Sequence, residues 1–131
     1  MKTLIVEDDF TSRFLLQEIL KAYGTVHIAV NGKEAVQAVS TSMANKEPYQ
    51  LICMDIMMPE MDGQSAVKEI RTLEEKNGTL LTSGVKIVMT TALNDLKNVS
   101  KAYSNLCDGY LTTPIDKARI VQELRKHGLI N

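Results

Sequence analysis

The sequence lacks the features that mark several classes of protein. Its 131 residues include only 2 Cys, too few for a disulfide scaffold. Proline is also scarce, with 3 residues. Hydrophobic residues make up 44%, which rules out a disordered chain or a collagen-like fibre. The clearly apolar runs reach only four residues, as at 51–54, so none can cross a bilayer. The N-terminus meets acid at Glu7 and does not resemble a secretory signal.

The sequence also lacks an excess of either charge. Fifteen Lys and Arg stand against 16 Asp and Glu, which gives a formal net charge of −1. This balance argues against direct nucleic-acid binding, which usually requires a basic surface. The length suits one compact domain. We therefore expect residues 1–131 to form a single cytoplasmic domain.

Short apolar segments alternate with helical patterns along the chain. The predicted strands cover residues 3–6, 25–30, 51–54, 85–89 and, more briefly, 110–111. Helices are expected between and after them, including one over 95–106 and a last one over 116–126. In the first helix, Phe14, Leu15, Ile19 and Leu20 are expected to fall on one side. Residues 74–76 are expected to form a solvent-exposed helix face. The alternation predicts an α/β fold, with a five-stranded parallel sheet in order 2-1-3-4-5 and five helices on both faces.

Polar residues gather where the predicted strands end. They are Glu7, Asp8 and Asp9 after the first strand, Asp55 after the third, and Thr90 and Thr91 after the fourth. Ligands in open α/β sheets bind at the carboxyl ends of the strands. Clustered carboxylates need a cation, and oxygen ligands without Cys or His favour Mg²⁺. A carboxylate beside that ion can also act as a nucleophile. The alternative is that each acid only caps the helix that follows it.

Several motifs, taken in order, resemble the receiver domain of two-component response regulators, of the single-domain chemotaxis type. They are residues 4–9 (LIVEDD), 55–63 (DIMMPEMDG), 91–92 (TA) and 109–110 (GY), with Pro114 four residues further on. The resemblance covers essentially the whole chain, and residues 55–63 are its most specific part. It implies the same flavodoxin-like fold.

The resemblance implies a role for each matching residue. Asp55 would be the phosphoacceptor, taking a phosphoryl group from a phosphohistidine on a sensor histidine kinase or a phosphotransfer protein. Thr91, rather than its neighbour Thr90, would bind a phosphoryl oxygen through its hydroxyl. Tyr110 would be the aromatic residue whose ring moves inward when Thr91 is drawn to the phosphate.

The resemblance also implies a Mg²⁺ site. Its ligands would be Glu7, Asp8, Asp55 and the backbone carbonyl of Met57, with Glu7 acting largely through water. The pair Glu7–Asp8 is preferred because Arg13 then falls where many receivers carry an Arg in the first helix. Asp9 would begin that helix. The alternative pair Asp8–Asp9 stays open.

One position departs from the family pattern. Receivers normally carry a Lys immediately before the last Pro, and here Thr113 precedes Pro114. Thr113 can donate a hydrogen bond but brings no charge. A partly shielded opposite charge near 4 Å is worth about 4 kcal/mol before desolvation. We therefore expect the protein to accept phosphate but to couple it to the conformational change less tightly or by another route.

Two further apolar positions bear on how long the phosphate lasts. Met57 and Leu93 lie two residues after Asp55 and Thr91. In receiver domains, the side chains at these two positions flank the path of the water molecule that hydrolyses the phosphoryl group. Neither side chain can orient a water molecule. The sequence therefore predicts slow loss of phosphate, unless the two side chains merely cover the site.

The function expected from these motifs is that of a stand-alone receiver with no output domain. It would be no enzyme beyond its own phosphorylation, and it would be a monomer or weak dimer. It would signal by protein contact through its fourth helix, fifth strand and fifth helix, around residues 97–125. The alternative is a pseudo-receiver that binds proteins without using phosphate. A haloacid-dehalogenase phosphatase is disfavoured because Met57 occupies the place of its second Asp, and a flavin protein because acids follow the first strand.

Overall fold

The strands form one parallel sheet, as the sequence predicts. The computed structural model describes residues 1–58, 61–79, 84–92 and 106–131. The strands are β1 (Lys2–Val6), β2 (Thr25–Ala29), β3 (Leu51–Asp55), β4 (Lys86–Ala92) and β5 (Gly109–Thr113). All pairs are parallel and the order is β2-β1-β3-β4-β5. This order confirms the predicted topology.

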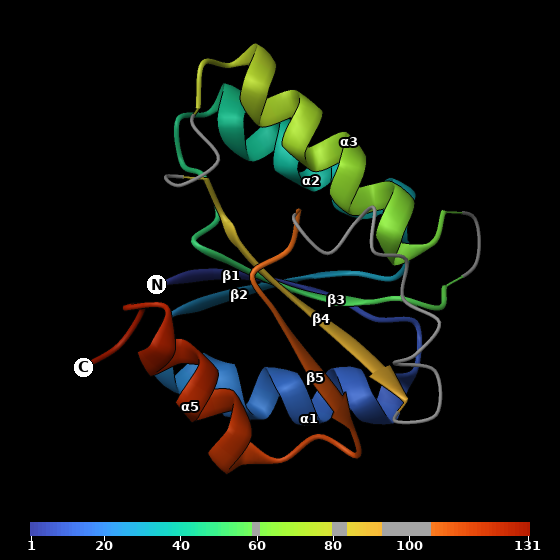
Figure 1. Cartoon of the computed structure of the whole chain (residues 1–131), viewed down its shortest axis with the longest axis vertical. Helices are drawn as coiled ribbons and strands as arrows, with labels where there is room; N and C mark the ends of the chain where they lie inside the picture. Colours follow the sequence, from blue (N-terminus) through green and yellow to red (C-terminus); the bar gives the residue numbers. More distant parts are fainter. Residues whose placement is uncertain (59–60, 80–83, 93–105) are drawn as a thin grey trace.

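Helices cover both faces of the sheet (Figure 1). They are α1 (Phe10–Leu20), continued by a 3₁₀ turn at Lys21–Tyr23, α2 (Gly32–Ala44), α3 (Gly63–Lys76) and α5 (Lys117–Lys126). α2 and α3 pack on one face, and α1 and α5 pack on the other. The helix predicted over 95–106 lies almost wholly outside the described residues. No helix of the described part of the chain could span a membrane.

The sheet separates two apolar cores because successive strand residues point to opposite faces. Leu4, Ile52 and Met89 belong to the core under α2 and α3. Ile5, Cys53 and Val88 belong to the core under α1 and α5. The strands β1, β3 and β4 are therefore buried on both faces, and Glu7, Asp8 and Asp55 lie where β1 and β3 end.

The apolar side predicted for α1 is only partly buried. Leu16, Ile19 and Leu20 are buried against the sheet, whereas Phe14 and Leu15 are exposed. The helix is apolar on more than one side, so its periodicity alone does not decide which side packs. Contact with the core on this face of the sheet decides it.

Two other predictions needed correction. β4 continues to Ala92, so Thr90 and Thr91 are buried strand residues rather than residues beyond the strand. Glu74 is buried rather than exposed, because its carboxylate accepts hydrogen bonds from Arg71 and from the backbone N–H of Val85. Hydrogen bonds of this kind offset the cost of burying the charge.

Candidate functional site

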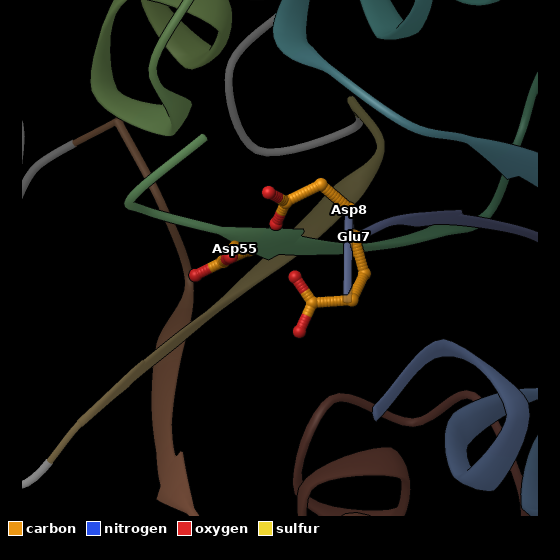
Figure 2. A group of neighbouring side chains, drawn as sticks. All are labelled: Glu7, Asp8 and Asp55. Carbon is orange, nitrogen blue, oxygen red and sulfur yellow. The ribbon is translucent and has the colours of Figure 1, made fainter. Parts of the chain in front are cut away.

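Three carboxylates meet at the carboxyl end of the sheet. Glu7 and Asp8 follow β1, and Asp55 is the last residue of its neighbour β3. One oxygen from each of the three lies within 4.8 Å of the other two. Figure 2 shows the three side chains turned toward one another. The predicted acidic cluster is therefore present as a group of adjacent side chains.

Glu7 is the most deeply placed of the three acids. Its residue is 5% exposed, and its Oε2 atom has no hydrogen-bond partner among the described residues. Burial, followed by the contact with Asp55, raises the pKa of Glu7 from its ordinary 4.5 to about 8. A buried charge without a partner is costly, so this carboxyl holds its proton unless a cation lies beside it.

Asp55 is half-buried and has a similar environment. Burial is the main cause that raises its pKa, and the hydrogen bonds to Asp55 act in the opposite direction. One of these comes from the backbone N–H of Met57, which lies 3.3 Å from Oδ1. The Met57 side chain is 69% exposed, so it does not cover the carboxylates as a buried residue would.

Among the described residues, no Lys or Arg forms an ion pair with Glu7, Asp8 or Asp55. The three carboxyl groups therefore have no cationic side chain as a partner in this part of the chain. Arg13 lies nearby, but its Nη1 donates to the backbone carbonyls of Glu7 and Asp8, at 3.2 and 3.5 Å. An unpaired buried oxygen within a set of hard oxygen ligands suits a divalent ion such as Mg²⁺.

Asp9 caps a helix, which is the alternative role predicted from the sequence for each acid. Its carboxylate accepts a hydrogen bond from the Ser12 N–H at 2.9 Å and caps α1. This bond lowers the pKa of Asp9. The capping explanation therefore holds for Asp9, while Glu7 and Asp8 face Asp55, which favours the Glu7–Asp8 register.

The hydroxyl residues lie at the same end of the sheet. Thr90 is the register partner of Asp55 on β4. The Thr91 hydroxyl is buried and donates to the carbonyl of Ala92 at 3.4 Å. Thr113 ends β5 opposite Ala92 and is joined to Pro114 by a cis peptide bond. The positions agree with the predicted set, but each role remains a prediction.

Tyr110 is placed differently from the carboxylates. It lies opposite Met89, near the start of β5, and its hydroxyl accepts a hydrogen bond from the Cys107 thiol at 3.1 Å. Burial is the main cause that raises the pKa of Tyr110. In this structure the hydroxyl is therefore engaged at the amino end of β5.

A second charged cluster, around Arg71 and Glu74 on α3, was missed from the sequence. The helical spacing contained a signal, since Val67, Arg71 and Glu74 recur at i, i+4 and i+7 and share one face. Both charged residues are 8% exposed. A charged pair on an apolar face indicates a buried ion pair.

Comparisons with known proteins agree with this architecture. A sequence profile of the response regulator receiver domain matches residues 3–125. The chain is 38% identical over 133 residues to hybrid signal transduction histidine kinase B of Dictyostelium discoideum, an alignment that covers 96% of this chain but 6% of that protein. It is 32% identical over 124 residues to the chemotaxis protein CheY of Halobacterium salinarum, which covers 94% of this chain and 92% of that one.

Solved structures give the same result. The receiver domain of Ssk1, co-crystallised with the histidine phosphotransfer protein Ypd1 from Saccharomyces cerevisiae, superposes with a TM-score of 0.80 at 30% identity, covering 98% of this chain and 89% of that one. The receiver domain of the Arabidopsis thaliana histidine kinase CKI1 complexed with Mg²⁺ gives 0.77 at 27% identity, over 94% and 90%. The chain belongs to the family of response regulator receiver domains.

Proposed function

We propose that residues 1–131 act as one cytoplasmic receiver unit that accepts a phosphoryl group on Asp55. The donor would be a phosphohistidine on a histidine kinase or phosphotransfer protein. An Asp55 carboxylate oxygen forms the new P–O bond as the P–N bond breaks, and the imidazole leaves with the electron pair and takes up a proton. The observation that carries this proposal is the buried Glu7 oxygen without a partner, beside two further carboxylates.

The proposed metal ligands are Glu7, Asp8, Asp55 and the Met57 carbonyl. Bound Mg²⁺ would neutralise charge on the transferred group, and catalysis in such transfers is mostly positioning and electrostatics. The Met57 N–H holds Oδ1 of Asp55, which would help to orient the carboxylate for attack. Thr91 would then bind a phosphoryl oxygen in place of its weak bond to Ala92.

The phosphoryl donor is proposed to dock on α1, next to the acids. Phe10 and Phe14 are 68% and 52% exposed, and their rings stack with centroids 6.1 Å apart. Arg13 lies over the Phe10 ring and also holds the Glu7 carbonyl. The proposed output surface is formed by the fourth helix, β5 and α5.

Intact-mass measurement after incubation with acetyl phosphate and Mg²⁺ tests the proposal. We expect a phosphoryl adduct on the wild-type protein and none on Asp55→Asn. Asp9→Asn is the matched control, because asparagine also caps helices, and it should keep the adduct. An adduct on Asp55→Asn would contradict the assignment.

A pseudo-receiver is the second candidate, favoured by the uncharged Thr113 and by the lack of an ion pair to the carboxylates in the described residues. It predicts no adduct, even when a phosphorylated kinase is supplied, with partner binding unchanged in Asp55→Asn. The two candidates thus differ in the same measurement.

A further inference from the structure

A compensated charge cluster lies at the amino end of the sheet. Arg71 on α3 donates from Nη1 to Glu74 Oε1 at 2.6 Å and from Nη2 to Asp108 Oδ2 at 3.1 Å. Glu74 Oε2 accepts from the Val85 N–H at 2.8 Å. Gly84 lies directly against this carboxylate, where a Cβ would clash with it. The cluster therefore joins α3 to the start of β4.

The same guanidinium also holds the segment that leads into β5. Arg71 Nε donates to the Leu106 carbonyl at 2.7 Å. Asp108 is fixed from the other side, since its carboxylate accepts from the Ile87 N–H and its own N–H donates to the Ile87 carbonyl. Residues 106–108 are thus fixed between α3 and β4.

Cys107 is the middle residue of this fixed segment. Its thiol donates to the Tyr110 hydroxyl at 3.1 Å. Burial is the main cause that raises the pKa of Cys107, so the thiol keeps its proton at neutral pH and remains a donor. Cys107 and Tyr110 both pack against the core under α2 and α3. The Tyr110 hydroxyl is therefore bonded to a residue whose two neighbours, Leu106 and Asp108, are bound by Arg71.

α3 also reaches the phosphoacceptor at its other end. The Gly63 N–H donates to the Ile56 carbonyl at 2.9 Å, and a Cβ on Gly63 would clash with the Asp55 carbonyl. One helix therefore contacts the residue after Asp55 at its start and holds the Tyr110 segment near its end.

We infer that Arg71 and Cys107 are positioning residues that hold Tyr110 in its resting orientation, so that this contact opposes the phosphorylated state. The inference rests on the proposed function. The Cys107–Tyr110 hydrogen bond is made in the orientation that the ring has in this structure, and it would break if the ring moved inward toward Thr91. By linkage, a contact made in one state only lowers the affinity for any ligand that favours the other.

Fluorine NMR of protein labelled with 3-fluorotyrosine tests the inference. The Tyr110 resonance is assigned by its loss in Tyr110→Phe. In ligand-free protein, Cys107→Ala should shift or broaden this resonance, and Cys107→Ser, which keeps a donor, should restore most of it. Cys53→Ala removes a thiol from the opposite core and is the matched control. An unchanged Tyr110 resonance in Cys107→Ala overturns the inference.

Titration with beryllofluoride and Mg²⁺ then measures the coupling. Loss of the thiol contact should lower the half-saturating concentration about three- to tenfold, the effect of one hydrogen bond. Arg71→Lys keeps the charge but loses the planar guanidinium group that donates to three acceptors. We therefore expect a smaller decrease of the half-saturating concentration in this variant. An unchanged or raised half-saturation in Cys107→Ala overturns the coupling.

The two proposals fail in different ways. If beryllofluoride moves no resonance in any variant while Cys107→Ala still moves Tyr110 in free protein, the proposed function fails and the positioning role stands. If wild type responds to beryllofluoride and Cys107→Ala is identical to it in both experiments, the positioning role fails and the proposed function stands.

Discussion

The two ends of the sheet carry acidic groups of similar type in opposite electrostatic conditions. At the amino end, Glu74 and Asp108 share the guanidinium of Arg71 and accept hydrogen bonds from backbone N–H groups. At the carboxyl end, Glu7 is equally buried but has an oxygen with no partner in the described residues. The first cluster has its hydrogen-bond donors within the chain, whereas the second is the proposed site of a cation from outside it.

This difference separates the structural acid Glu74 from Glu7, the acid proposed to be functional. Burial alone does not distinguish them, because Glu7 and Glu74 are both largely removed from solvent. What differs is whether each carboxylate oxygen has a donor, because a buried acceptor without one is costly. Stability and ligand binding should therefore respond oppositely to substitutions at the two ends.

The largest effect is expected from Arg71→Met. Removing the cation leaves the buried Glu74 and the partly buried Asp108 without their charge partner, which should lower the free energy of unfolding by ~3–5 kcal/mol. Urea denaturation measures it. Arg125→Met, on the exposed side of α5, is the control and should change stability by less than ~0.5 kcal/mol. Equal urea midpoints for Arg71→Met and Arg125→Met would show that the charge cluster at the amino end of the sheet does not stabilise the protein as we expect.

Glu7→Gln should act in the opposite direction. The raised pKa of Glu7 means that its contribution to stability without Mg²⁺ is fully present below its ordinary pKa of 4.5 and is lost as pH rises through about 8. Thermal unfolding in EDTA should therefore show stability falling across this range, by on the order of 2 kcal/mol.

The Gln variant should have a flatter profile and exceed wild type at pH 8. Asp9→Asn is again the control, since the lowered pKa of Asp9 affects stability only at more acidic pH. Added Mg²⁺ should stabilise wild type far more than Glu7→Gln. Parallel pH profiles for wild type and Glu7→Gln would refute the assigned cause.

Thr113→Lys supplies the cation that the carboxyl end lacks, so it should make the two clusters more alike. We expect a gain of about 1 kcal/mol in stability without Mg²⁺ and tighter beryllofluoride binding, both measured by thermal shift. Thr112→Lys is the matched control, because successive strand residues point to opposite faces. Unchanged phosphorylation and partner binding in Thr113→Lys would show that the missing charge has no consequence.

Met57→Asn should have the smallest effect, confined to the rate of phosphate loss. A polar side chain next to Asp55 can orient water, so the phosphorylated variant should decay several-fold faster than wild type. Intact mass followed after removal of the donor gives the rate, and Met57→Leu should decay like wild type. A wild-type half-life of seconds would contradict the slow loss expected from the sequence. Its companion residue, Leu93, lies outside the described residues.

The sequence predicted the features that depend on short-range pattern. Apolar runs predicted the strands, and their alternation with helices predicted the parallel sheet. Acids at strand ends predicted a cluster of Glu7, Asp8, Asp9 and Asp55, from which the resemblance to receivers selected Glu7, Asp8 and Asp55. These follow locally because the carboxyl ends of parallel strands share one end of the sheet.

What the sequence did not predict depends on partners distant along the chain. The burial of Glu74 requires Arg71 and the backbone of Val85, which lies 11 residues away. The exposure of Phe14 depends on which side of α1 meets the sheet. The Tyr110 hydroxyl is bonded to Cys107, which lies between two residues that Arg71 binds. In each case the local sequence pattern was compatible with more than one arrangement of the side chain, and a tertiary contact determined which one formed.

The packing of Gly84 against Glu74 has a consequence for how the chain tolerates mutation. In a survey of every single substitution scored by cellular abundance, residues 71, 74 and 84 should be depleted, since almost any change there exposes an unpaired charge or a clash. Neutral substitutions at Glu7 should survive such a screen or be enriched in it. Scored for signalling instead, the same substitutions at Glu7 should be lost. Selection for cellular abundance and selection for signalling should therefore act on residues at opposite ends of the sheet.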